Sequence, residues 1–356
     1  MIDNSNYKIV PTCELVIGGA FSALYDYDRY RMIRFESVFV PIVEELASGG
    51  VSTEDLKDFN LSTQSKIKKF INLLLTEDVL FSDNHMQNPP FSKMSNYWDK
   101  PNEIENCIVD VTDKMPDWDL LFSQLLSLQC EALQIRCYSE LIDIDVVVQI
   151  LEKLQGTCIS QVEFMIKGKN LNSKIAYEEL FEKFPSLVFV MLHSSIQNVC
   201  HEITINNTPI RRLLILQKRP LLSEKQCGSI KMDMLGQPST NFCTELKSHQ
   251  GCLNRKVSMR SDGQICNCPS LKKNYGSDLS KLNSIVRTKD FQNIWNLKND
   301  FVKVCKNCEF RYVCTGCRAY LETPDSREKP AGCQYDPVKG VWETDIAKIQ
   351  FSEIFQ

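Results

Sequence analysis

The stretch Cys305-Lys-Asn-Cys308-Glu-Phe-Arg-Tyr-Val-Cys314-Thr-Gly-Cys317 places four cysteines within thirteen residues, near the end of a chain of 356 residues. Two residues separate the members of each pair. At this spacing, neighbouring thiolates ligate metal centres while backbone amides donate hydrogen bonds to the sulfurs. The stretch therefore predicts a metal centre held by cysteine thiolates.

A second cysteine pattern lies upstream, where Cys252 and Cys268 flank an Asp-Gly turn at Gly263. Such a turn joins antiparallel strands, so the two cysteines are predicted to meet across a hairpin. With Cys333 near the end, seven cysteines follow one another in this order. Residues 221–342 are therefore predicted to form a Cys-rich domain in which bound metal supplies stability that a small core cannot.

The distribution of the other cysteines is different. The start of the chain is polar and lacks the apolar segment of a secretory signal, which predicts a cytoplasmic protein. Disulfides do not persist in a reducing cytosol, so dense cysteines there indicate metal binding or redox chemistry. Ten of the 16 cysteines follow residue 220. The other six are scattered and are expected to be small buried apolar residues: Cys13, Cys107, Cys130, Cys137, Cys158 and Cys200.

Composition argues against two classes of partner. The net charge of −4 gives no overall electrostatic attraction to nucleic acid or to anionic lipid. No run approaches 18 uninterrupted apolar residues, so no membrane-spanning helix is expected. Neither nucleic acid nor a membrane is predicted as a partner.

Residues 1–85 are predicted to form a small winged-helix-like module. Aromatic and charged residues alternate over residues 21–39, as they do in paired strands. Start and stop signals predict helices over residues 42–46 and 52–59 and a longer one from residue 62, with a closing strand over residues 79–81. A linker follows over residues 84–100, which are rich in Asn, Ser and Pro.

Residues 101–220 alternate between apolar runs and helical patterns. Strands are predicted over residues 107–111, 133–138, 162–166, 187–192 and 212–217, and helices over residues 118–126, 144–154 and 174–184. This alternation indicates βα units with a parallel sheet. Too few units are present for a full eight-unit barrel, so a partial βα barrel is expected. The predicted fold class is α/β. In the Cys-rich domain, short strands are predicted over residues 256–259 and 264–267, and a helix over residues 290–297.

The cysteine order resembles the SPASM domain, which is appended to many radical S-adenosylmethionine enzymes that mature peptides and holds two auxiliary [4Fe–4S] clusters. The βα region resembles the partial barrel of those enzymes, here degenerate, and the first module resembles their leader-peptide recognition element. Several stretches resemble more closely the SPASM-domain peptide maturases of grasp-with-spasm systems: Tyr25-Asp-Tyr-Asp-Arg29, Cys227-Gly228, Cys252-Leu-Asn-Arg-Lys256, Cys308-Glu-Phe-Arg-Tyr312 and Arg318-Ala-Tyr320. In such systems the maturase is paired with an ATP-grasp ligase that acts on a short ribosomal precursor peptide.

The resemblance implies two ligand sets. One consists of Cys305, Cys308, Cys314 and Cys333, and the other of Cys252, Cys268, Cys317 and one upstream cysteine. Cys227 is preferred as that upstream ligand because the Cys-Gly pair fits the closer family, and Cys243 is the alternative. Cys266 is expected not to be a ligand. The two residues between Cys314 and Cys317 depart from the three more usual in SPASM domains.

Zinc is the alternative metal. A structural zinc site needs four ligands, which the pairs Cys305/Cys308 and Cys314/Cys317 would supply. The five residues between those pairs are few for a zinc ribbon. A single zinc ion would also leave Cys252, Cys268 and Cys333 without a role. A two-zinc arrangement is a further alternative, and iron–sulfur clusters are favoured.

The signature of radical S-adenosylmethionine enzymes is missing. Those enzymes need three cysteines spaced C-x3-C-x2-C after the first barrel strand, and no two cysteines of this chain are four positions apart. Only Cys107 lies at the expected place. Standard reductive cleavage of S-adenosylmethionine is therefore not supported, and the same absence marks the grasp-with-spasm group.

Two functions of different classes follow. In the first, the protein is an enzyme that modifies a ribosomal precursor peptide beside an ATP-grasp ligase. In the second, it is a non-catalytic scaffold that presents the precursor to the ligase. Ligation of each cluster by four cysteines leaves no open coordination site, which favours the scaffold. The family's role as maturases favours the enzyme. The sequence assigns neither the reaction nor any catalytic residue.

Overall fold

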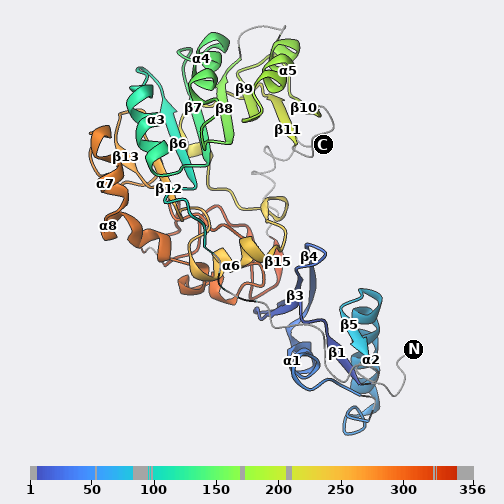
Figure 1. Ribbon diagram of the computed structural model, residues 1–356. Helices are drawn as coiled ribbons and strands as arrows, with labels where there is room; N and C mark the ends of the chain where they lie inside the picture. Colours follow the sequence, from blue (N-terminus) through green and yellow to red (C-terminus); the bar gives the residue numbers. More distant parts are fainter. Residues whose placement is uncertain are drawn as a thin grey trace.

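The computed structural model describes residues 6–52, 54–82, 95, 97, 99–168, 173–205, 211–323, 325 and 327–342. Figure 1 shows a large mixed α/β part with a small N-terminal module at one end. No helix in the described ranges is long and apolar enough to cross a membrane. Most of the predicted linker over residues 84–100 lies outside the described residues.

The large part is organised around an eight-stranded sheet in the order β10-β11-β9-β8-β7-β6-β12-β13. Its strands are β6 (Asn106–Val111), β7 (Ala132–Cys137), β8 (Gln161–Lys167), β9 (Leu187–His193), β10 (Val199–Ile203), β11 (Arg212–Leu216), β12 (Lys256–Met259) and β13 (Ile265–Cys266). All neighbours pair in parallel except β10 with β11 and β12 with β13. The five predicted βα-region strands are confirmed, and the mostly parallel sheet is consistent with a partial α/β barrel.

Three predicted helices cover one face of this sheet: α3 (Trp118–Ser127), α4 (Ile144–Leu154) and α5 (Ser173–Lys183) (Figure 1). Aspartates cap two of them, since Asp117 accepts a hydrogen bond from Leu120 N at 3.0 Å and Asp143 one from Val146 N at 3.1 Å. Alternate strand residues such as Val109 pack into the core beneath the helices. The opposite face of the same strands carries polar residues.

The Cys-rich region (residues 221–342) is continuous with this sheet. β12 pairs in parallel with β6, so that Lys256 lies opposite Asn106, and the predicted hairpin forms the sheet edge. Its helices are α6 (Thr240–Ser248), α7 (Leu282–Val286) and α8 (Lys289–Gln292). The sequence did not predict α6. The helix predicted over residues 290–297 is α8 followed by a 3-10 turn over Asn293–Asn296.

The N-terminal module (residues 6–82) contains a three-stranded antiparallel sheet, two helices and a strand pair. The sheet has the order β2 (Cys13–Val16), β3 (Phe21–Asp26) and β4 (Arg31–Glu36), which leaves one edge of β4 without a partner strand among the described residues. The helices are α1 (Val40–Ser48) and α2 (Leu61–Thr76), and β1 (Tyr7–Ile9) pairs with β5 (Leu80–Ser82). The predicted hairpin, both of these helices and the closing strand are confirmed.

The short helix predicted over residues 52–59 is wrong. Ser52 donates from its backbone N–H and its hydroxyl to Asp55, each at 2.7 Å, as a helix start would. Residues 54–58 form turns. Asn60 then caps α2 by accepting a hydrogen bond from Thr63 N at 2.9 Å.

The sheet of the N-terminal module packs on both faces. One face, with Leu24, Ile33 and Phe35, covers α1 and α2. The other face packs against the Cys-rich region in a core that contains Val16, Ala23, Tyr25, Tyr27, Cys243, Phe310, Val313 and Tyr335. The module is therefore docked on the Cys-rich region through its own sheet.

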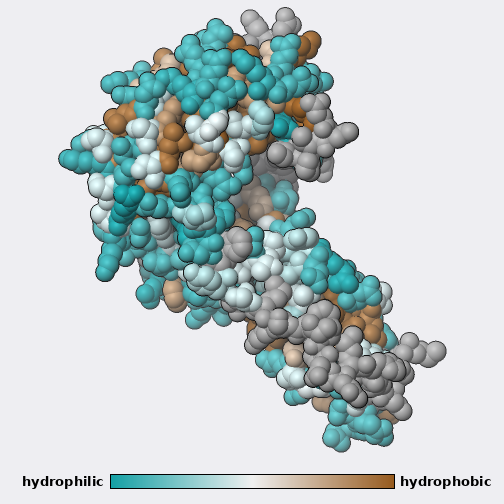
Figure 2. All heavy atoms as spheres, viewed as in Figure 1, coloured by the Kyte–Doolittle hydropathy of each residue, from teal (hydrophilic) through white to brown (hydrophobic). Residues whose placement is uncertain are grey.

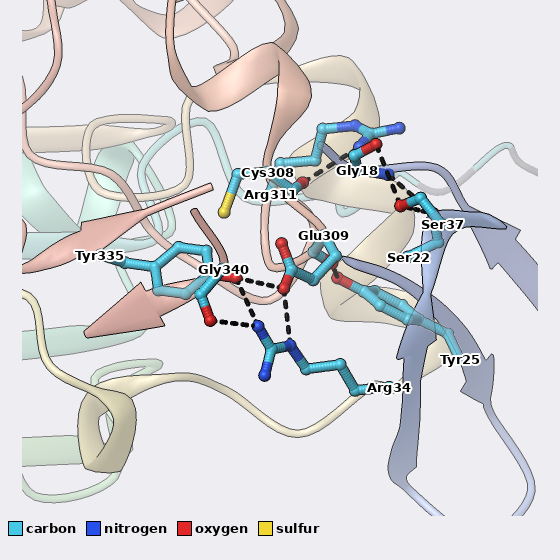
Figure 3. A network of polar contacts seen from close by, with 10 residues as sticks. All are labelled: Gly18, Ser22, Tyr25, Arg34, Ser37, Cys308, Glu309, Arg311, Tyr335 and Gly340. Atoms are coloured by element: carbon cyan, nitrogen blue, oxygen red, sulfur yellow. Dashed lines mark hydrogen bonds and ion pairs between the residues drawn. The ribbon is translucent and has the colours of Figure 1, made fainter. Parts of the chain in front are cut away.

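A buried carboxylate lies at the centre of this contact (Figure 3). Glu309, which is fully buried, accepts a hydrogen bond from Arg34 Nε on β4 at 2.8 Å and another from the hydroxyl of Tyr335. Arg34 Nη2 also donates to Tyr335 Oη at 2.8 Å and to Gly340 O at 2.7 Å. The hydroxyl of Tyr25 donates to Glu309 O at 2.7 Å. Glu309, which follows Cys308 in the chain, thus anchors the N-terminal module to the Cys-rich region.

Replacing Arg34 with Met leaves the Glu309 carboxylate buried without its cation. We expect the Arg34→Met variant to lose about 2–4 kcal/mol of free energy of unfolding, because an uncompensated buried charge is strongly destabilising. Urea unfolding of variant and wild type at pH 7 measures the loss.

The matched control is Arg211→Met, which removes an ion pair with Glu202 at 2.7 Å whose side chains are 69% and 52% exposed. Exposed pairs contribute little, so this variant should lose no more than about 0.5 kcal/mol. Equally small losses in both variants would contradict the anchoring role of Arg34.

Candidate metal centres

The six scattered cysteines differ in how far they are buried. Cys107, Cys130 and Cys137 are buried, as predicted. The same prediction is wrong for Cys158 and Cys200, which are exposed, and Cys13 is only partly buried. Cys200 lies on the edge strand β10, where alternate residues face solvent, and Cys158 lies in the loop that follows α4.

Four cysteines from four separate segments form what we call the first cysteine group: Cys227, Cys252, Cys268 and Cys317. Burial raises the pKa of the Cys268 thiol to about 11, and Cys252 and Cys227 are close enough to raise it further. Burial also raises the pKa of Cys317, which has the same two thiols as neighbours. Lys256 Nζ donates to Cys252 Sγ at 3.5 Å. A lysine cation therefore adjoins this group.

The second cysteine group consists of Cys305, Cys308, Cys314 and Cys333. These four thiols line one small cavity of about 30 Å³, whose wall also includes Phe310 and Trp342. Burial raises the pKa of Cys305 to about 11 and that of Cys314 to about 12, and Cys333 raises both further. Burial also holds the pKa of Cys308 well above its usual value, with Cys305 and Cys314 nearby.

Backbone amides oppose these increases in a regular pattern. Four thiols each accept a hydrogen bond from the backbone amide two residues later, which lowers the pKa of the thiol. The pairs are Cys268 with Ser270, Cys308 with Phe310, Cys314 with Gly316 and Cys317 with Ala319. Ala319 N lies 3.4 Å from Cys317 Sγ. Gly316 has a φ of +63°, which favours glycine. Amides directed at sulfur stabilise the thiolate, the form that binds metal.

A buried glutamine connects the two groups. Gln250 Nε2 donates to Thr315 O at 2.7 Å and to Gly316 O, and its Oε1 accepts from Leu253 N at 2.6 Å. Cys252 N also donates to Thr315 O, at 3.1 Å. The loop between Cys314 and Cys317 is thus held against the segment that carries Cys252. Sequence reasoning missed Gln250, and no spacing or motif marks it.

The two remaining cysteines of the region, Cys243 and Cys266, belong to neither group. Cys243 on α6 is fully buried in the core shared with Tyr25 and Tyr27, and Lys247 and Glu14 are the charged groups near it. Cys266 on β13 is buried too, and its Sγ donates to Ser258 O at 3.6 Å. Within the described ranges, no three His, Cys, Asp or Glu side chains converge closely enough to hold a single metal ion.

The polar face of the sheet holds an ion pair that the sequence did not predict. Arg136 on β7 donates from Nε and Nη2 to the two oxygens of Asp110 on β6, at 2.7 and 2.9 Å, and both side chains are buried. Burial raises the pKa of Asp110 even though Arg136 opposes it. Cys227 lies near Arg136. The sequence does contain a signal for this pair, because Asp110 and Arg136 each interrupt an apolar strand at a position that alternates with core residues.

An apolar groove of about 700 Å³ lies on the N-terminal module between the end of β4, α1 and α2. Its apolar lining includes Val38, Phe39, Phe70 and Leu73, and its polar lining includes Glu36, Thr63, Lys66 and Lys69. Figure 2 shows an apolar area exposed on this module. The groove adjoins the strand whose edge has no partner among the described residues.

No family model matches the chain, and no curated protein matches it. Among solved structures, it is similar to SuiB of Streptococcus suis with a TM-score of 0.36 and 11% identity, over 92% of this chain and 100% of that one. SuiB bound to S-adenosylmethionine gives the same values. SuiB bound to its precursor peptide SuiA gives a TM-score of 0.33 and 12% identity, with the same coverage. Values this low transfer no residue role, so the proposals below rest on this chain's own residues.

Truncating Gln250 tests how the two cysteine groups are held together. We expect the Gln250→Ala variant to lose about 1–3 kcal/mol of free energy of unfolding, because the carbonyls of Thr315 and Gly316 lose a donor in a buried site. Urea unfolding measures the loss. The control Gln64→Ala removes a surface hydrogen bond to Phe59 O of 2.8 Å and should change stability by less than about 0.5 kcal/mol. A Gln250→Ala variant as stable as this control would show that the contact is dispensable.

Proposed function

We propose that the protein takes part in the maturation of a ribosomally made precursor peptide and holds two [4Fe–4S] clusters. Two observations support the proposal: Cys305, Cys308, Cys314 and Cys333 line one cavity, and Cys227 and Cys252 both lie near Cys268 and Cys317. The proposed ligands of one cluster are Cys227, Cys252, Cys268 and Cys317, and those of the other are Cys305, Cys308, Cys314 and Cys333. Cys227 is preferred to Cys243 because Cys243 is enclosed by aromatic residues of the docked module.

The donor set fits iron–sulfur clusters better than zinc. Four sulfurs around one tetrahedral zinc ion lie about 3.8 Å apart, given a Zn–S distance of about 2.3 Å. Within the described residues, no three His, Cys, Asp or Glu side chains are placed so that they could hold one metal ion. A [4Fe–4S] cluster binds each thiolate to a different iron, so its four sulfurs lie farther apart. Amides directed at the sulfurs are also typical of such sites.

When bound, such clusters supply one-electron redox chemistry. The chain's own residues prepare the sites for them. The amides of Ser270, Phe310 and Ala319 stabilise thiolates, and Lys256 adds a positive charge beside Cys252. Phe310 and Trp342 line the second group and exclude water from it.

Standard cleavage of S-adenosylmethionine is not part of the proposal. Cys107, the one cysteine at the place where that chemistry needs three, is buried in the core on the helix side of β6. The other face of β6 carries Asp110, which is paired with Arg136. No thiol of β6 therefore faces the polar side of the sheet.

The N-terminal module is proposed as the site that binds the leader part of the precursor. An extended peptide adds readily to an unpartnered strand edge, and β4 offers one beside an apolar groove. Lys66 and Lys69 at the groove favour a peptide that carries acidic as well as apolar residues. In this proposal residues 1–85 form the peptide-binding module, residues 101–220 a degenerate barrel and residues 221–342 the SPASM domain. An ATP-grasp ligase acts on the same peptide.

A non-catalytic scaffold is the second candidate function. It is favoured by the presence of four thiols in each group, because complete ligation leaves no iron open to a substrate. In that case the clusters stabilise the fold, and the protein presents the precursor to the ligase.

Metal analysis of anaerobically purified protein tests the cofactor proposal. We expect about eight irons per chain, with matching sulfide. Cys305→Ala and Cys252→Ala each remove one ligand of one cluster and should each retain about four irons. Cys243→Ala is the matched control and should retain all of the iron. A colourless protein with stoichiometric zinc would refute the proposal, and loss of iron in Cys243→Ala would refute the choice of Cys227.

Peptide binding tests the groove. We expect Leu73→Asp, at a position 45% exposed in the groove, to weaken binding of a fluorescently labelled synthetic precursor peptide at least about tenfold, because it introduces a charge into an apolar contact. The control Ile175→Asp changes a residue 69% exposed on α5 and should bind as the wild type does. Equal affinities for both variants would exclude the groove.

The same peptide separates the enzyme from the scaffold. Wild-type protein is incubated anaerobically with bound precursor and a reductant, with and without S-adenosylmethionine, and the peptide mass is measured. A change in mass supports the enzyme. An unchanged mass under conditions where the peptide binds supports the scaffold.

A further inference from the structure

The loop that joins β2 to β3 in the N-terminal module, residues 17–20, contacts the segment that carries two thiols of the second group. Cys305 and Cys308 lie at the two ends of a 3-10 turn, in which Cys308 N donates to Cys305 O at 3.0 Å. A turn this short satisfies few of its own backbone groups. Gly19 N donates to Asn307 O at 2.8 Å. The β2–β3 loop thus supplies the partner for a carbonyl inside the turn that positions the two cysteines.

The same loop lies against the residue that follows Cys308 (Figure 3). A Cβ atom on Gly18 would lie 3.0 Å from Glu309 N, which is closer than ordinary van der Waals contact. Arg311 Nη1 donates both to Ile17 O at 2.7 Å and to Cys308 O at 3.0 Å. Its side chain is only 12% exposed, so water competes little for these bonds. The β2–β3 loop and the backbone of Cys308 therefore share one donor.

The loop also contacts the segment that carries a third thiol. Ala20 N donates to Pro337 O at 2.9 Å, and a Cβ atom on Gly19 would lie 2.5 Å from the same oxygen. Pro337 follows Cys333 closely in the chain, and Cys333 Sγ donates to Tyr335 O at 3.9 Å. Three of the four thiols of the second group therefore belong to segments that the β2–β3 loop contacts.

The first cysteine group is held differently. In the described part of the chain, the hydrogen bonds of its cysteines lead to other residues of the Cys-rich region: Glu224, Lys256, Ser270, Leu271, Thr315 and Ala319. None of these residues belongs to the N-terminal module. The contacts of the β2–β3 loop therefore distinguish the second group from the first.

We propose that the β2–β3 loop is a positioning element of the second metal centre, which places Cys308 for its cluster. The inference rests on the two-cluster proposal above, and it makes the N-terminal module a part of that centre as well as a peptide-binding module. A cluster needs four thiolates at defined positions. Removing a contact that orients a metal ligand typically lowers metal affinity about 10–100-fold. Loss of the loop's contacts should therefore empty the second centre and leave the first one loaded.

The test is the iron content of full-length variants purified anaerobically, together with electron paramagnetic resonance of the reduced protein. The wild type should hold about eight irons and give two signals, and Cys305→Ala assigns one signal to the second group. In Gly18→Ala the new methyl group displaces the loop from Glu309 N, and Arg311→Met removes the shared donor. Each of these two variants should hold about four irons and lose the signal of the second group alone.

Two variants of the same module separate the position of the loop from the stability of the module. Gly49→Ala changes a glycine that has a φ of −102° and no atom within 4 Å of an added Cβ, so this variant should hold about eight irons. Leu46→Ala opens a cavity in the module's own core, where Leu46 is fully buried, and lowers stability without changing the loop. It should retain both signals.

The outcomes distinguish this inference from the proposal on which it rests. About eight irons in Gly18→Ala or in Arg311→Met would overturn the inference, as would loss of both signals in Arg311→Met. If Gly18→Ala does not fold, the result of Arg311→Met decides. Loss of the second signal in Leu46→Ala would also overturn it, because the stability of the module would then explain the loss. A wild type without iron would instead refute the two-cluster proposal.

Discussion

Parallel pairing between β6 and β12 determines where the cysteines of the last third lie. It attaches the hairpin of β12 and β13 to the βα strands, so Cys252 and Cys268 lie just before and just after the edge of one large sheet. The loop that contains Thr315 then packs against the Cys252 segment through Gln250. This loop joins the second cysteine group to the first, and the N-terminal module docks beside the second group through Glu309. The whole arrangement therefore depends on this strand pairing.

Buried charged side chains are a second feature on which the arrangement depends. Glu309 and Asp110 are almost entirely removed from water, and the carboxylate of each accepts a hydrogen bond from an arginine guanidinium. Replacing both members of such a pair with apolar residues often costs a protein little stability, whereas removing only one leaves a buried charge, so buried pairs are weak explanations of stability alone. They do specify geometry, because a guanidinium binds a carboxylate from few directions. Here they fix the contact between the N-terminal module and the Cys-rich region and the contact between β6 and β7.

Much of the fold could be predicted from the sequence because its signals are local. The βα strands are apolar runs between amphipathic helices, and α2 shows Ile67, Phe70 and Leu74 at helical spacing. The edge strand β10 and the helix α6 were missed, since exposed or mostly polar segments lack a clear apolar period. For the candidate site, spacing indicated the cysteines but could not indicate Gln250 or the pairing of Arg136 with Asp110. Those roles arise from contacts between residues far apart in the chain, which a local pattern does not encode.

The contact between the N-terminal module and the rest also has a consequence for biosynthesis. Arg34 donates to Gly340 O, and Ala20 N donates to Pro337 O at 2.9 Å, so these early residues are covered by residues that are made much later. A ribosome releases the chain from its first residue onward, and domains fold in that order. The face that carries Ala23 and Tyr25 is therefore uncovered until Phe310 and Tyr335, which pack against it, have been made. During that interval its apolar side chains are exposed to contacts with other proteins.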